Sequence, residues 1–216
     1  MKRQIVAVAL FLAMLNMLCG CAFGFNKPES ALDEFMSQDS LMEVLSRFDD
    51  IPSEDDDVAT DFLVDIITSP SIKALLLDNV RTLSYNITST SIDGNKATIT
   101  ALITHYDISP IIDSAVAAAY IKVVGLAALG SEIPEEGDES MELLMPLISQ
   151  SIREAALNME PTETYTTVRF YCVKNASGLW ELEEIPDDFL DKVLLMNFQP
   201  ALVDGLDHFG QYGYLG

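Results

Sequence analysis

Two pairs of short segments with alternating apolar and polar residues constrain the fold of this chain most. Residues 83–88 and 97–104 alternate in this way and are separated by Asp-Gly-Asn at 93–95. Residues 164–174 and 180–182 form the second pair, separated by Asn-Ala-Ser-Gly. Alternation with a period of two is typical of half-buried strands, and glycine-containing turns of this kind join antiparallel strands. The chain is therefore predicted to contain two β-hairpins.

Helical spacing of apolar residues predicts helices on both sides of the hairpins and between them. The predicted helices cover 28–48 as one or two segments, 62–67, 110–130 and 143–157, with a last one from 186. Ser69-Pro70 is expected to end the helix at 62–67, and residues 71–77 to add one short turn. Residues 199–216 contain four glycines and are expected to be loosely ordered.

This order of elements predicts a single α+β domain over 28–198 with a helical insert at 109–160. A curved antiparallel sheet of about four strands would pack against helices on one face. The segment from 110 to 130 is almost entirely apolar and, at about 1.5 Å per residue, could just span a membrane. Flanking strands favour a helix that is buried on most faces, against the sheet or a second copy of the chain.

A resemblance adds to this prediction of the fold. The segment YNITSTSIDGNKATITALITHYD at 85–107 and the later hairpin KNASGLWEL at 174–182 are similar to a pattern in small Firmicutes lipoproteins of uncharacterised domain families. The resemblance implies the cystatin-like fold of the nuclear transport factor 2 superfamily, a curved sheet wrapped around a helix with a cone-shaped pocket. It covers most of residues 28–196. It informs the fold more than the function, because that superfamily includes both enzymes and binding proteins.

The N-terminus has the three parts of a signal peptide in their usual order. Lys2 and Arg3 precede an apolar stretch at 5–18, and Gly20 follows as a small residue before Cys21. A transmembrane anchor is the alternative, but the apolar stretch has about 14 residues and a span needs roughly 20. Its length therefore favours cleavage over anchoring.

The cleavage site, Leu18-Cys19-Gly20-Cys21, resembles the lipobox of bacterial lipoproteins. The resemblance implies removal of residues 1–20 and attachment of diacylglycerol to the Cys21 thiol. Cys19 fits less well, because Leu18 would then occupy the position that requires a small residue. The expected partner is the lipid bilayer, the expected location is the extracytoplasmic face of the cell membrane, and residues 21–27 form the lipidated tether.

The remaining cysteine and the charge limit other possibilities. Cys172 would be alone in the mature chain, so no intramolecular disulfide could form, and its strand position predicts a buried thiol. The chain has 34 acidic and 12 basic residues and a net charge of -22. Without Lys2 and Arg3 the mature charge is 10 minus 34, or -24. A surface of this sign repels phosphates, which excludes nucleic acid as a partner.

Few residues could carry catalytic chemistry, because the chain has only two histidines. His105 and Asp107 lie on one side of a predicted strand, and the resemblance implies a pocket lined by His, Asp and Tyr, as in ketosteroid isomerase and scytalone dehydratase. The candidate pocket residues are His105, Asp107 and Tyr85. The favoured interpretation is structural, with His105 at a rim and Asp107 capping a helix. No metal site or cofactor is expected, and the acidic segments 49–57 and 132–139 are expected to be solvated loops.

Three functions follow, in order of preference. The first is a non-catalytic, membrane-anchored lipoprotein that binds a small molecule or an envelope protein. The second is a pocket enzyme that uses His105 and Asp107. The third is a structural envelope protein that dimerises through the apolar helix at 110–130.

Overall fold

The computed structural model describes residues 26–46, 65–129 and 138–212. The predicted signal peptide, Cys21, the acidic segment 49–57 and most of the acidic segment 132–139 lie outside this part. The helices and strands are α2 (Pro28–Phe35), α3 (Gln38–Ser46), α5 (Pro70–Thr82), β1 (Ser84–Asp93), β2 (Lys96–Asp107), α6 (Ser109–Ala128), α7 (Asp138–Asn158), β3 (Thr162–Lys174), β4 (Trp180–Leu182), the π-helix η2 (Phe189–Leu194) and α8 (Phe198–Tyr212).

The four strands form one antiparallel sheet in the order β1-β2-β3-β4, which confirms the predicted α+β class. β1 and β2 are joined by a two-residue turn at Gly94-Asn95, where Gly94 has a φ of 60°. Glycine takes this left-handed conformation without steric cost and suits the first position of a type II′ turn. The helical insert, α6 and α7, lies between this hairpin and the second one.

The turn of the second hairpin is organised by the side chain of Asn175. The Asn175 side-chain oxygen accepts hydrogen bonds from the backbone N–H groups of Ser177 and Leu179 at 3.0 and 3.1 Å. Asparagine commonly organises turns in this way. Gly178 supplies the one residue of this turn with a positive φ, 76°.

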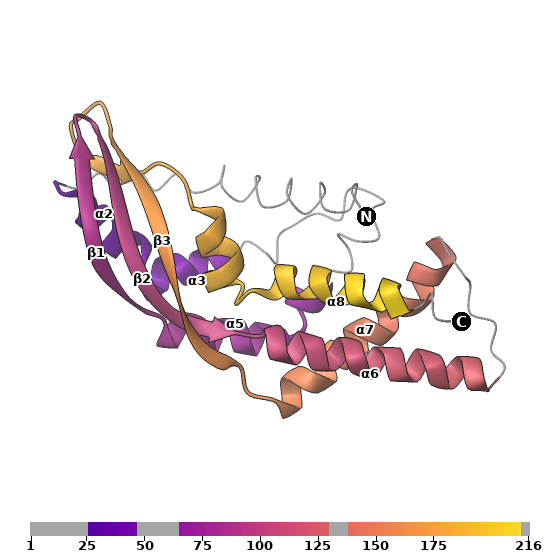
Figure 1. Cartoon of the computed structure of the whole chain (residues 1–216). Coiled ribbons are helices and arrows are strands. Elements are labelled where there is room, and N and C mark those ends of the chain that lie inside the picture. The colour runs from indigo at the N-terminus through magenta and orange to yellow at the C-terminus, as the bar shows by residue number, and fades with distance from the viewer. Residues whose placement is uncertain (1–25, 47–64, 130–137, 213–216) are drawn as a thin grey trace.

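Helices cover one face of the curved sheet, as Figure 1 shows for α2, α3 and η2. Apolar residues of β2 and β3 point to this face and are buried: Ala97, Ile99, Ala101, Ile103, Val168, Phe170 and Cys172. Rings from three elements meet there, with centroids of Phe35, Phe170 and Phe189 between 5.2 and 6.1 Å apart. The alternation that predicted the strands therefore reflects a real division between a core face and an outer face.

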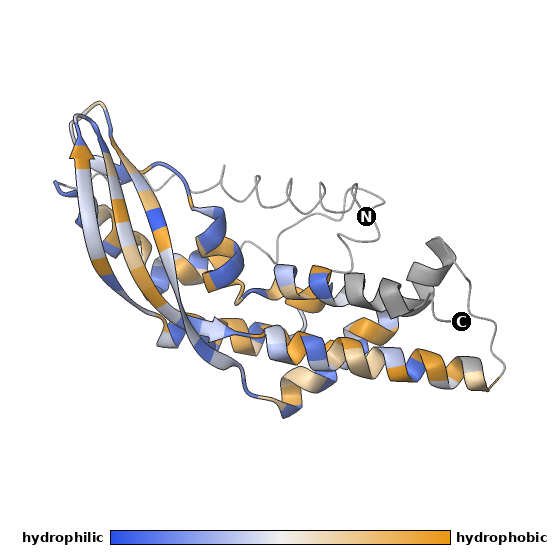
Figure 2. Ribbon diagram, viewed as in Figure 1, coloured by the Kyte–Doolittle hydropathy of each residue, from blue (hydrophilic) through white to orange (hydrophobic). Residues whose placement is uncertain are grey.

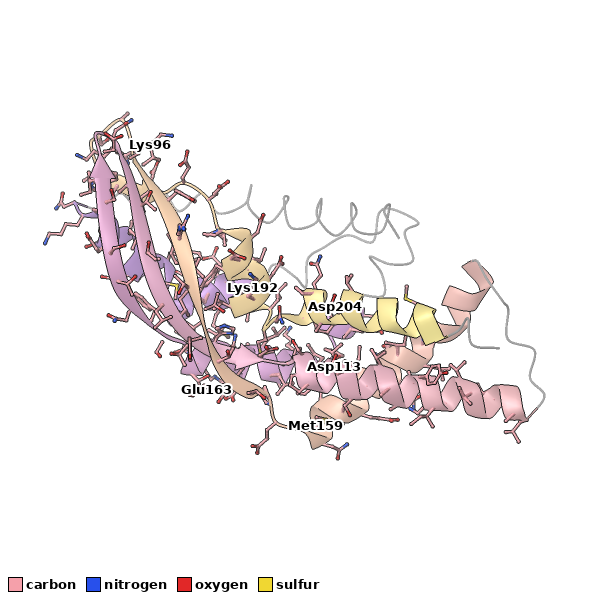
Figure 3. The ribbon with its side chains drawn as sticks, in the orientation of Figure 1. Lys96, Asp113, Met159, Glu163, Lys192 and Asp204 are labelled. Carbon is pink, nitrogen blue, oxygen red and sulfur yellow. The ribbon has the colours of Figure 1, made fainter. Side chains whose placement is uncertain are left out.

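The outer face of the sheet is mainly hydroxyl-bearing. Register places Thr98, Thr100 and Thr104 of β2 opposite Tyr171, Arg169 and Tyr165 of β3. Leu102, Tyr165 and Tyr171 are exposed on this face. In Figure 3, Lys96 marks the tip of the sheet, and Glu163 marks its base, close to the start of α6.

α6, α7 and α8 extend away from the sheet, so the molecule is elongated (Figure 1). α6 packs on α7 and α8 rather than on the sheet. By length and composition, α6 is the one helix among the described residues that could cross a membrane, yet only 33% of its residues 109–126 are buried. The expectation that this helix is buried on most faces is therefore wrong for a single copy.

Two further helices differ from the sequence predictions. The helical stretch at 65–67 ends before Ser69-Pro70, as predicted. Residues 71–77, expected to form one short turn, belong to α5, a longer helix of 13 residues with Pro70 at its first position. Residues 198–212 form α8 instead of a loose tail. Phe198, Ala201 and Leu202 of α8 are buried, and Gly205 lies against Val116 of α6.

Candidate functional site

The candidate pocket residues His105 and Asp107 lie at the end of β2, where the chain turns into α6. Two other segments of the chain meet this point. The Ile108 N–H donates to the carbonyl oxygen of Met196 at 3.0 Å, and the Tyr106 N–H donates to the side chain of Asn79 at 2.8 Å. This place is called the β2–α6 junction below, and it comprises residues 105–109, Asn79 and residues 193–197.

Both ring nitrogens of His105 are already engaged. Nδ1 lies 2.7 Å from the carbonyl oxygen of Tyr106, and Nε2 lies 2.8 Å from the hydroxyl oxygen of Thr166 on β3. A carbonyl oxygen can only accept a hydrogen bond, so Nδ1 must carry a proton. In the neutral ring, Nε2 then accepts from the Thr166 hydroxyl, which assigns the tautomer of His105.

Burial keeps His105 neutral at physiological pH. Its side chain is buried on the core face of the sheet, so the expectation that His105 lies at a rim is wrong. Burial lowers the pKa of His105 below its usual value, although the hydrogen bond to Tyr106 and the charge of Asp107 act in the opposite direction. A neutral imidazole with both nitrogens in internal hydrogen bonds joins β2 to β3.

Asp107 caps the start of α6. Its Oδ1 accepts hydrogen bonds from the backbone N–H of Ser109 at 2.8 Å and from the Ser109 hydroxyl at 2.6 Å. The Ser109 hydroxyl oxygen accepts in turn from the Asn197 side-chain amide at 2.8 Å. A carboxylate at this position satisfies a free N–H group and interacts favourably with the helix dipole.

Tyr85, the third candidate, has a different partner. It lies opposite Ile103 in the register of β1 and β2, and its hydroxyl donates to Asp33 Oδ1 on α2 at 2.5 Å. Burial raises the pKa of Tyr85, and the hydrogen bond to Asp33 and its charge raise it further. The structure therefore places His105 and Asp107 together and directs the Tyr85 hydroxyl to α2.

Asn79 is the residue of this junction that sequence reasoning missed. It is fully buried on α5, and its amide nitrogen donates to the carbonyl oxygen of Val193 at 2.8 Å while its oxygen accepts from Tyr106. One side chain thereby connects α5, β2 and η2. The signal was present as a polar residue beside the buried helical row Ile72, Leu76 and Val80.

The segment that leads from η2 into α8 has unusual backbone geometry. η2 is a π-helix, and Met196 and Asn197 after it have φ values of 53° and 64°. Positive φ is costly for residues with a Cβ, although asparagine tolerates it better than methionine. Hydrogen bonds from Ile108 to Met196 and from Asn197 to Ser109 hold this conformation in place.

Asp191 on η2 is a half-buried carboxylate in an unfavourable setting. Its Oδ1 is buried and has no hydrogen-bond partner among the described residues. Burial raises the pKa of Asp191, the charges of Asp187 and Asp188 add to this effect, and Lys192 opposes it, which together bring the pKa to about 6. A carboxyl group of this kind exchanges protons near neutral pH.

Cys172, the possible metal ligands and Cys21 are the remaining candidate groups. Cys172 is buried, as predicted, and burial raises the pKa of its thiol to about 11, which disfavours the reactive thiolate. Within residues 26–46, 65–129 and 138–212, no three His, Cys, Asp or Glu side chains are grouped so as to hold a metal ion. The lipid-attachment residue, Cys21, lies outside the described residues. The geometry at the junction is that of a structural hydrogen-bond network.

Comparison with known proteins adds one structural relative. No protein-family model matches the chain, and no curated protein sequence matches it. One solved structure to which it is similar is that of ycdA from Bacillus subtilis subsp. subtilis str. 168, described as a "putative lipoprotein". The two share 19% sequence identity with a TM-score of 0.38, over 77% of this chain and 45% of the other. This chain thus matches less than half the length of that protein.

Proposed function

We propose that the protein is a non-catalytic lipoprotein, anchored by acylated Cys21 at the extracytoplasmic face of the cell membrane. The observation that carries this proposal is the N-terminal sequence, in which Lys2 and Arg3, an apolar stretch at 5–18 and Leu18-Cys19-Gly20-Cys21 follow one another in order. The cystatin-like fold implied by the sequence resemblance stays a prediction and is not needed for this function.

The physical basis of the anchor is the burial of acyl chains. Each buried CH₂ contributes about 0.8 kcal/mol, so two chains hold a protein to a bilayer far more firmly than one. Residues 22–27 would connect the acylated Cys21 to α2 over at most about 20 Å. The folded domain would therefore remain close to the membrane, although its negative charge disfavours contact with anionic lipids.

Replacement of each cysteine of the lipobox tests the anchor. Cells grown with a labelled fatty acid should incorporate it into the wild type and into Cys19→Ser, and lose it in Cys21→Ser. Cys19→Ser is the matched control, because it makes the same change two residues away. Label that persists in Cys21→Ser, or is absent from the wild type, would refute the proposal.

The non-catalytic part of the proposal is supported by the β2–α6 junction. His105 uses both ring nitrogens within the protein, and Asp107 accepts two hydrogen bonds from Ser109. A general base needs a lone pair directed at a substrate proton. His105 offers none in this arrangement, and Oδ1 of Asp107 is occupied by Ser109. We therefore infer that the domain acts by binding a small molecule or an envelope protein.

Exposed side chains on the outer sheet face favour the protein alternative. Leu102, Tyr165 and Tyr171 are exposed there, and aromatic residues are enriched in protein interfaces. A partner that can be cross-linked in intact cells should be lost in the double variant Tyr165→Ala/Tyr171→Ala. It should be retained in Ile92→Ala, which removes an exposed side chain at the hairpin tip. Equal recovery from both variants would contradict a role for this face.

A further inference from the structure

α6 has an apolar surface that is exposed in the part of the chain that the structure describes. Its side chains Ile121 and Val124 are 70% and 48% exposed, and Leu129, just after the helix, is 84% exposed. Ala117, Gly125 and Ala128 are also exposed. These six residues lie on one side of the helix, mostly at spacings of three and four, and are called the α6 outer face here. Figure 2 shows α6 mainly in apolar colours.

The α6 outer face is also free of negative charge, which is unusual in this chain. Residues 114–129 contain no Asp or Glu, although the protein has 34 acidic residues. The one charged side chain in this stretch, Lys122, is directed to Ser151 and Glu154 of α7 at 3.2 and 3.1 Å. Monomeric proteins expose apolar patches of up to a few hundred Å², and such patches are often functional. Two acidic molecules could approach each other here without opposing their carboxylates.

Gly125 is a second, independent observation on this face. Glycine inside a helix costs about 0.5–1 kcal/mol relative to alanine. A Cβ added at Gly125 would meet no atom within 4 Å, so the fold of one copy does not require glycine here. A small residue beside large ones lets the backbone of a second helix come close. The ridges that side chains at i±4 form on one helix then fit into the grooves of the other. Adsorption to a bilayer surface would not require a small residue at this position.

We propose that the α6 outer face binds the same face of a second copy, with the two helices antiparallel about a two-fold axis. A two-fold interface requires that each residue meet its partner reciprocally. With the axis level with residue 123, Ile121 of each copy lies opposite Gly125 of the other. The same register sets Leu129 opposite Ala117, so these two large side chains each face a small residue, and Val124 lies next to the axis.

The size of this surface predicts a weak interface. The α6 outer face extends from residue 117 to residue 129, which is about 20 Å of helix, and is about 10 Å wide, so it covers roughly 200 Å² per copy. This is below the roughly 800 Å² per partner of stable complexes. Confinement to a membrane raises the effective concentration and compensates for low affinity. In this respect the dimer rests on the proposed lipid anchor.

Anionic lipid is the main competitor for the α6 outer face, and charge disfavours it. The acidic segment 132–139 follows α6 directly in the sequence. Acidic residues beside an apolar helix oppose its adsorption to a negatively charged membrane surface. In the proposed register, residues 117–129 of one copy lie opposite residues 117–129 of the other, a stretch without Asp or Glu.

Cysteine cross-linking in membranes of cells that express the full chain tests the proposal. Val124 is the residue of the α6 outer face nearest the proposed axis, so Val124→Cys should form dimers several-fold more efficiently with a short bis-maleimide than Thr167→Cys, a control on the outer sheet face. Adding Gly125→Leu to Val124→Cys should reduce the dimer several-fold. This second change should not harm the monomer, because there is space at Gly125.

Three results would overturn the dimer. The first two are equal cross-linking of Val124→Cys and Thr167→Cys, and no effect of Gly125→Leu. In the third, the thiol of Val124→Cys does not react with a membrane-impermeant maleimide although no dimer forms. That result would assign the face to the bilayer or another protein. Fatty-acid labelling of the same samples keeps the two proposals apart. Loss of label with dimers retained would refute the anchor alone, and label with no dimers would refute the dimer alone.

Discussion

Single polar residues at the β2–α6 junction connect parts of the chain that are distant in sequence. Asn79 joins α5 to β2 and η2, and His105 joins β2 to β3. Buried polar groups are stabilising when every hydrogen-bonding atom has a partner and costly when one is lost. Asn79 and His105 meet this condition, whereas Asp191 does not.

Replacement of Asn79 should destabilise the protein strongly. Asn79→Ala would leave the buried N–H of Tyr106 and the carbonyl of Val193 without this partner. We expect the free energy of unfolding to fall by about 2–4 kcal/mol. Urea denaturation measures this change, and Asp78→Ala, which alters the exposed neighbouring residue, should cost less than about 1 kcal/mol. Equal effects of the two substitutions would contradict a bridging role for Asn79.

Asp191→Asn should stabilise the protein at pH 7. The carboxyl pKa is about 6 in the folded state against 3.8 for the unperturbed group, so folding favours the protonated form. Stability from this group is therefore present below pH 4 and lost as the pH rises through 6. We expect a gain of about 1–2 kcal/mol at pH 7.5.

The pH dependence separates Asp191 from other groups. The gain in Asp191→Asn should shrink as the pH falls to 4.5, because the wild-type carboxyl is then protonated. His105 acts in the opposite direction, since its lowered pKa makes folding less favourable as the pH falls below its unperturbed value of 6.5. Urea denaturation at both pH values, with exposed Glu184→Gln as control, makes the measurement. A gain that is the same at both would rule out titration of Asp191 as its cause.

At the scale of elements, the hairpins were predictable from the sequence and two helices were not. Alternation and turn residues mark β1 to β4 because one sheet face is buried and the other is in water. The sequence predicts only a short turn at 71–77 where the structure has the 13 residues of α5, because Ser69-Pro70 both ends one helix and begins the next. The four glycines of residues 199–216 predict loose order, whereas α8 forms there and Gly205 permits its close contact with Val116.

The candidate site was predictable only in part. The sequence indicated that His105 and Asp107 share a face, and the structure places both at the β2–α6 junction. The sequence could not indicate Asn79 as a further residue of this junction. Its side chain reaches Tyr106 and Val193 only after α5 and η2 have packed together. Hydrogen bonds between residues far apart in sequence leave no local pattern to detect.

Two glycines inside helices should respond oppositely to the same substitution. Gly125→Ala should raise the free energy of unfolding by about 0.5–1 kcal/mol, because alanine favours the helix and the space is open. In Gly205→Ala the new Cβ would lie 2.9 Å from a Val116 methyl carbon, so α8 must shift from α6. The cost of such overpacking is about 1–3 kcal/mol and should exceed the gain in helix propensity. Stabilisation of both variants in urea would show that α8 does not pack on α6 as described.

At the scale of the whole molecule, the protein is an elongated acidic domain with a sheet at one end and three helices at the other (Figure 1). The proposed anchor precedes α2, which packs on the sheet. α6 extends away from that end and carries the α6 outer face. An acidic domain attached in this way would stay near a membrane through its lipid rather than through its surface charge, which anionic lipids repel.

The mass of the N-terminal peptide of the protein purified from membranes tests the central claim most directly. The account predicts that the peptide begins at Cys21, lacks residues 1–20, and carries the added mass of a diacylglyceryl group on the thiol. A peptide that begins at Met1 and retains the apolar stretch, or one that begins after Cys21 without lipid, would contradict it.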